Sequence, residues 1–152
     1  MSSAAIYSQI VQCRQDIVAT EQELQKTEDI LAEQKDSLRS FISKRSSYES
    51  SLSGISNRAA NVASVSNNRL AKRYTDEFGD KLSRKGTMVS TLDQMDATMT
   101  REITENEMKC ADYRSQLANL RSRLSSLEAE YQAALRREAE EAAAAAAAAA
   151  NQ

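Results

Sequence analysis

The residues with chemical potential in this chain of 152 residues are two cysteines and many charged side chains. Cys13 and Cys110 are the only thiols, and there is no histidine. Structural zinc sites use four Cys or His ligands, and general bases at neutral pH are most often His, so we expect neither. No serine lies in a nucleophile elbow, and three isolated glycines cannot build a phosphate-binding loop. We therefore expect no enzymatic activity, metal, cofactor or small-molecule substrate, and two buried free thiols.

The charges are nearly balanced, with 20 basic and 22 acidic residues and a net charge of −2. This balance gives no overall field that would draw the protein to nucleic acid or to an anionic membrane. The sequence contains neither a secretory signal pattern nor an apolar run long enough to span a bilayer. We expect no nucleic-acid partner and no membrane span. We also expect synthesis in the cytoplasm, with any export following a route that needs no cleaved signal peptide.

The composition favours long helices. Proline and tryptophan are absent and aromatic residues make up 5% of the chain, whereas charged residues make up 28%. Because strong helix formers are abundant and the main helix breaker is missing, helices are favoured over sheets. With few bulky aromatic side chains, burial must follow a narrow seam between helices.

Two stretches, residues 6–55 and 89–134, place mostly apolar residues at alternating spacings of three and four. This is the pattern of a coiled-coil seam, and it predicts long helices at 4–52 and 88–137. Because the two seams have similar lengths, we expect each to be the other's partner. The predicted fold class is all-α, an antiparallel coiled-coil hairpin that forms a single domain over residues 1–137.

We expect residues 53–87 to form a connecting head with a short helix at 67–84. Gly54 predicts a left-handed cap that ends the first helix, and apolar residues at every fourth position indicate the short helix. The Ala-rich residues 138–152 are expected to form a helical or frayed tail. The candidate interaction residues of the turn and the short helix are Leu52, Gly54, Leu70, Tyr74, Phe78 and Leu82.

Antiparallel helices pair residues whose numbers add up to a constant, and a constant near 141 matches the apolar positions of the two seams. The same register pairs two polar interruptions, placing Gln34 opposite Asn106 and Arg45 opposite Asp96. A buried amide or charge without a partner costs about 1–3 kcal/mol or more. Matched polar pairs of this kind are therefore expected to set the register.

A competing register, with a constant of 123, would place Cys13 opposite Cys110. It would also turn the head into a continuation of a long helix and leave much of the second seam without a partner in the chain. In the first register the two cysteines are separated by roughly 27 Å along the axis, at about 1.5 Å per residue. A disulfide is possible only in the second register, because it requires Cα atoms within about 7 Å of each other.

The end of the first seam carries Leu52, Ser53 and Gly54, the spacing of an LXG or WXG turn. The predicted pattern of a long helix, a turn rich in Ser and Asn, a short helix around Phe78 and a second long helix covers residues 6–137. In this pattern the chain resembles the YwqH-like small helical proteins encoded beside LXG toxins of Gram-positive type VII secretion systems.

The resemblance implies a chaperone or targeting factor that pairs with the helical N-terminal domain of a toxin. A structural component of a secretion apparatus, filament or phage-like particle is the alternative. Either function requires another helical protein or a second copy of this chain as the partner. Self-assembly into large particles would favour the structural alternative, and a stoichiometric complex with one partner would favour the first.

Overall fold

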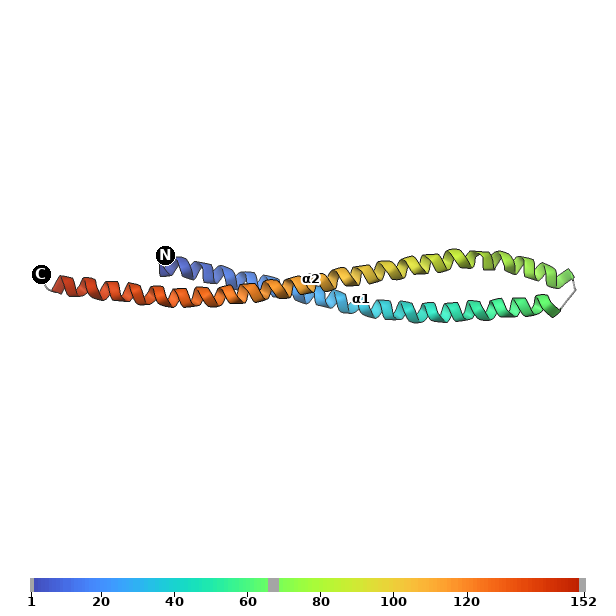
Figure 1. Ribbon diagram of the computed structural model, residues 1–152, viewed down its shortest axis with the longest axis horizontal. Coiled ribbons are helices and arrows are strands. Elements are labelled where there is room, and N and C mark those ends of the chain that lie inside the picture. The colour runs from blue at the N-terminus through green and yellow to red at the C-terminus, as the bar shows by residue number, and fades with distance from the viewer. Residues whose placement is uncertain (1, 66–68, 151–152) are drawn as a thin grey trace. The chain divides into compact units, whose positions relative to one another are not determined.

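The computed structural model describes residues 2–65 and 69–150, which form two α-helices (Figure 1). Helix α1 comprises Ser3–Val65 and helix α2 comprises Arg69–Ala150. Within these ranges, side chains are described except at 63–65, 70–71, 74–75, 78 and 80–83. The described residues contain no strand, and the two helices pack against each other, so the predicted all-α helical hairpin is confirmed.

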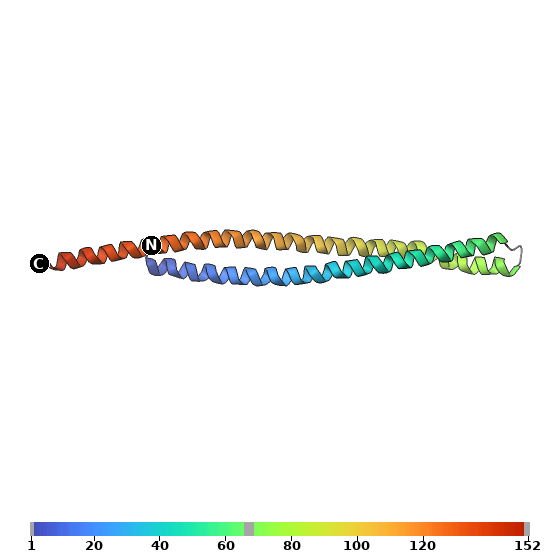
Figure 2. The same cartoon turned by 90° about the horizontal axis from the view of Figure 1, so that it is seen from below.

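The chain divides into two compact units. Unit 1 consists of Met1–Asp29 and Glu107–Gln152, and unit 2 consists of Ile30–Asn106. Within each unit, a segment of α1 and a segment of α2 lie side by side and run in opposite directions, as Figures 1 and 2 show. Each unit therefore buries its own part of the predicted seam.

The first turn of α1 is held from both helices of unit 1. The hydroxyl of Ser2 accepts a hydrogen bond from the backbone N–H of Ala5 at 3.4 Å, as an N-cap residue does. From α2, the carboxylate of Glu138 accepts hydrogen bonds from the backbone N–H of Ser3 at 2.8 Å and from its hydroxyl at 2.6 Å. A carboxylate at a helix N-terminus also interacts favourably with the helix dipole. These bonds fix the start of α1 against α2.

The core of unit 1 is the predicted seam. Its buried cluster is extended by the partly buried side chains of Ile17, Leu120, Leu124 and Tyr131. The rings of Tyr7 and Tyr131 lie 5.8 Å apart between centroids. Such contacts remove apolar area from water at about 25 cal/mol per Å². The buried members of the cluster are Ile6, Ile10, Cys13, Leu127 and Ala134.

The contacts between the two helices match a constant near 141, so the competing register is wrong. In unit 1, Ser3 is bonded to Glu138 and Arg14 is paired with Glu128 at 2.8 Å. The thiol of Cys13 lies 3.4 Å from the backbone carbonyl oxygen of Leu120. Cys13 and Cys110 are both buried and free, as predicted.

The predicted boundaries of the connecting head are wrong. Helix α1 continues past residue 52 to Val65, and α2 already begins at Arg69, so residues 69–84 belong to α2 rather than to a separate short helix. Gly54 is helical and has no positive φ, so it is not a cap. A glycine inside a helix costs only about 1 kcal/mol relative to Ala. Without proline, an established helix can absorb that cost, because each added residue gains a backbone hydrogen bond.

One predicted seam position is also wrong. Ile55 is 39% exposed, and the half-buried positions that follow Leu52 are Ser56 and Ala59. A step of four residues here replaces the expected step of three, which is a stutter in the heptad pattern. The seam therefore continues beyond Leu52 on small side chains.

The predicted tail is helical through Ala150, and all of its described side chains are exposed. In the described ranges of the chain, neither helix contains a stretch apolar enough to cross a membrane.

Candidate protein-binding site

The two polar pairs predicted from the sequence are both in contact in unit 2. The side-chain amide of Asn106 donates a hydrogen bond to Oε1 of Gln34 at 2.8 Å, and both side chains are half-buried. Arg45 lies 3.6 Å from the carboxylate of Asp96. Polar groups that lose water when they pack into a seam need such partners. The sequence pattern therefore located both pairs correctly.

Arg45 binds more carboxylates than predicted. It also pairs with Glu49 on its own helix at 2.8 Å and with Asp93 on α2, while its own side chain is only 19% exposed. The hydrogen bonds to Glu49 and Asp93 raise the pKa of the Arg45 guanidinium above its ordinary value. An arginine can serve several acceptors because its planar group carries five N–H donors. Arg45 and these three carboxylates are called the Arg45 cluster below.

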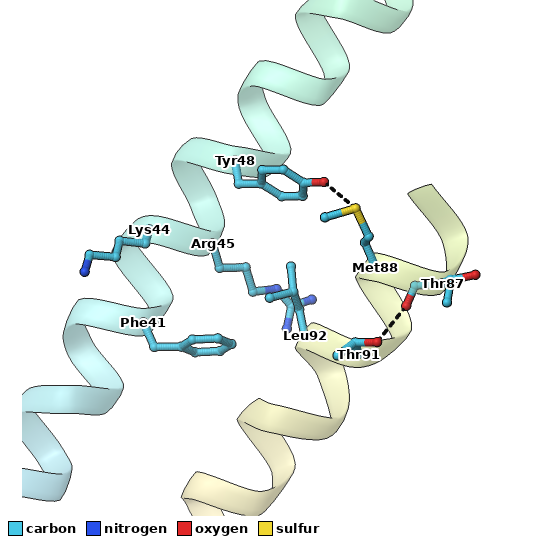
Figure 3. A pocket seen from close by; sticks show the side chains of 8 residues that line it. All are labelled: Phe41, Lys44, Arg45, Tyr48, Thr87, Met88, Thr91 and Leu92. Atoms are coloured by element: carbon cyan, nitrogen blue, oxygen red, sulfur yellow. Dashed lines mark hydrogen bonds between the residues drawn. The ribbon is translucent and has the colours of Figure 1, made fainter. Parts of the chain in front are cut away.

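Beside the Arg45 cluster, α1 and α2 enclose an open hollow of about 380 Å³ (Figure 3). Phe41 and Tyr48 extend from α1 toward Met88 and Leu92 of α2. The lining is mostly apolar, and the phenol of Tyr48 contacts Sδ of Met88 at 3.0 Å. The residues that line this apolar hollow are Phe41, Lys44, Arg45, Tyr48, Thr87, Met88, Thr91 and Leu92.

Exposed methionines lie at and near the apolar hollow. Met88 is 49% exposed, and Met95, seven residues further along α2, is 48% exposed. A spacing of seven places both on the same side of the helix. Methionine is flexible and polarisable, so it adapts to partner surfaces of different shape. This edge of unit 2 is therefore both apolar and accessible.

In unit 1, ion pairs between the helices cover one edge of the seam. The α1 residues of these pairs directly follow seam positions, whereas Lys44 and Met88 of the hollow directly precede them, so this edge is the opposite one. Arg114 pairs with Glu28 at 2.6 Å, and Arg121 pairs with Glu21 at 2.8 Å. Together with the Arg14 pair, these contacts recur every seven residues along α1. They cover the seam on that edge with charged, hydrated side chains, which leave little apolar surface exposed. None of the described residues that line the apolar hollow of unit 2 carries a carboxylate.

The interaction residues predicted in the head are only partly within the described structure. Leu52 is half-buried in the seam, and Gly54 is exposed on α1. The side chains of Leu70, Tyr74, Phe78 and Leu82 lie outside the described residues. Their role as an interaction surface stays a prediction.

Sequence reasoning missed the apolar hollow because each of its aromatic and leucine side chains was assigned to the seam. One signal in the sequence pointed to it. Met88 and Met95 each immediately precede a seam position, at a place where the first long helix carries mostly polar residues. Two methionines at this heptad position mark an apolar flank beside the seam.

Comparison with protein-family models, with curated proteins and with solved structures finds no match for this chain. Among the described residues, no group of three or more His, Cys, Asp or Glu side chains is arranged to hold a metal ion.

Proposed function

We propose that this chain is a non-enzymatic interaction protein that binds a helix of another protein in the apolar hollow of unit 2. The observation that supports this proposal is an apolar opening between α1 and α2, lined by two aromatic side chains and flanked by half-exposed methionines. An amphipathic helix that lies in an apolar groove is a recurring mode of protein recognition. Aromatic and methionine side chains are also enriched at such interfaces.

The two helices of unit 2 leave large apolar side chains partly exposed, and a third helix would bury them. Phe41, Tyr48 and Leu92 are only half-buried in the seam, although each carries a large apolar side chain. A partner side chain in the hollow would remove this area from water at about 25 cal/mol per Å². The gain offsets part of the cost of immobilising the partner.

The narrower proposal is that the partner is the helical N-terminal domain of an LXG-type toxin. It rests on the resemblance in the sequence pattern, of which the two long helices remain. Leu52, Ser53 and Gly54 do not form a turn, because they lie within α1. The separate short helix around Phe78, which was part of that pattern, is absent because α2 is continuous there.

The test is co-expression of this chain with the product of each adjacent gene, followed by size-exclusion chromatography with light scattering. We expect a stoichiometric complex with one helical protein, and we expect Met88→Glu to abolish it. Met108→Glu is the matched control, because Met108 is 64% exposed in unit 1 and does not line the apolar hollow. A complex that survives Met88→Glu would contradict binding at this site.

Self-assembly as a structural component is a second candidate, which a different surface favours. Tyr7, Val11 and Val18 of α1 are exposed in unit 1, and their spacing places them along one face of the helix. If this face joins copies of the chain, light scattering on the purified protein will report a multiple of the monomer mass. Val11→Glu would then return it to a monomer, whereas Met88→Glu would not.

A further inference from the structure

We infer that the helix bound in the apolar hollow is acidic, carrying Asp or Glu beside its apolar stripe. This inference rests on the proposed function and adds the charge of the partner. It follows from how the charged residues of two segments, 37–54 and 84–99, are distributed around the hollow.

The basic residues lie at the apolar hollow. Lys44 is exposed at its rim, on the side of α1 that faces away from α2 (Figure 3). It has no carboxylate partner among the described residues. On α2, Arg84 is exposed and Lys85 is half-buried one helical turn before Met88. Residues three and four apart lie on the same face of a helix, so Arg84 and Lys85 extend the edge that carries Met88.

The acidic residues of these segments are held elsewhere. Glu49, Asp93 and Asp96 are the only carboxylates in the two segments, and all three are bound to Arg45. None of them lines the apolar hollow. These carboxylates are thus directed to Arg45, and the charged residues at the hollow besides Arg45, namely Lys44, Arg84 and Lys85, are all basic.

A partner helix that docks in the hollow would contact basic side chains at its rim. Acidic residues beside its apolar stripe would pair with Lys44, and basic residues there would be repelled. Complementary charges at the rim of an interface mainly raise the association rate and exclude wrong partners. The charge should therefore decide which helices bind, while the apolar contacts supply most of the affinity.

The experiment uses two labelled synthetic helical peptides and the full chain. Both peptides carry the same leucines at helical spacing, and the flanking positions are Glu in one and Lys in the other. We expect the Glu peptide to bind about tenfold more tightly at low salt, with a smaller difference at high salt. Fluorescence anisotropy measures both affinities.

Three variants assign the effect to the site. Lys44→Glu should remove most of the preference for the Glu peptide. Arg136→Glu makes the same charge change at an exposed position of unit 1 and should leave the preference unchanged. Met88→Ser should weaken both peptides, because it removes apolar contact without changing charge. Circular dichroism confirms that each variant remains helical.

The outcomes separate this inference from the proposed function. If both peptides bind equally and Met88→Ser weakens both, the acidic partner is ruled out and the helix-binding hollow stands. If neither peptide binds and light scattering shows a dimer that Met88→Ser disrupts, a second copy covers the hollow and the inference is overturned. A preference for the Lys peptide would also overturn it.

Discussion

The side-chain amide of Asn106 donates a hydrogen bond to the amide oxygen of Gln34, which lies 72 positions away in the sequence, at 2.8 Å. This contact joins the two helices of unit 2 through half-buried polar groups. A slip of one heptad would separate the two amides and place Gln34 opposite Met99 or Tyr113. The bond therefore favours one register over its neighbours, at some cost in stability relative to an apolar pair.

Replacing one member of this pair should destabilise the hairpin. In Asn106→Leu, Gln34 loses its partner while its own side chain stays half-buried. We expect the free energy of unfolding to fall by about 1 kcal/mol, since a polar group left without a partner loses its hydrogen bond but stays partly hydrated. Urea denaturation followed by circular dichroism measures this change.

The double variant Gln34→Leu/Asn106→Leu should be at least as stable as either single variant, because no amide is then left unpaired. It should also lose register specificity, seen as bismaleimide cross-linking of cysteine pairs that belong to neighbouring registers. Additive losses from the two single substitutions would show that the pair is not energetically coupled.

Replacing Arg45 should destabilise unit 2 more than replacing a fully exposed arginine. Arg45→Leu leaves Glu49, Asp93 and Asp96 close together without a counter-charge, so their mutual repulsion opposes packing. Arg39→Leu is the control, because among the described residues Arg39 pairs only with the nearby Asp36, and it is highly exposed. Thermal denaturation should show a lower midpoint for Arg45→Leu and little change for Arg39→Leu. Equal midpoints would mean that the Arg45 cluster contributes nothing.

The contact between Glu138 and Ser3 should make the first turn of α1 sensitive to pH. Hydrogen bonds from the hydroxyl and then the backbone N–H of Ser3 hold the pKa of Glu138 below its ordinary value of 4.5. The folded state therefore binds this proton more weakly than the unfolded chain does. The stabilisation is present above the ordinary pKa and is lost as the pH falls through the lowered value.

Hydrogen exchange at the first amides of α1 measures this effect. Glu138→Gln should increase exchange near neutral pH and have little effect at a pH below both pKa values. Glu141→Gln, an exposed glutamate on the same helical tail, is the control and should change nothing. Equal protection in Glu138→Gln and the native chain at neutral pH would rule out this role of the carboxylate.

Cross-linking tests the register of unit 1. In a chain without its two native cysteines, Arg14→Cys/Glu128→Cys should be joined by a short bismaleimide within one molecule, because Arg14 and Glu128 are in contact. Arg14→Cys/Lys109→Cys, the pair favoured by the competing register, should not be joined. In the native chain, both buried thiols should react slowly until urea unfolds the protein. Mass spectrometry after digestion identifies the products.

The seams, the two polar pairs and the register were predictable from the sequence because each follows from one-dimensional spacing. Gln34 and Asn106 interrupt their seams at positions that match only when the helices run in opposite directions near a constant of 141. The buried free thiols followed from the same register. Only the arithmetic of residue numbers was needed, since an α-helix converts sequence spacing directly into a position on its surface.

The tertiary structure decided where the helices end and which edge of the seam stays open. Glycine often terminates helices, but the cost of Gly54 inside α1 is smaller than the stabilisation gained by continuing both helices. The sequence around Gly54 shows the cost and does not show this gain. Likewise, the sequence spacing assigns Phe41 and Leu92 to the seam. The hollow between them depends on how side chains of the two helices pack, which spacing does not show. Arg45 binds three carboxylates because packing brings Asp93 and Asp96 to it from α2. Lys44, at the apolar edge, has no carboxylate partner in the described part of the chain.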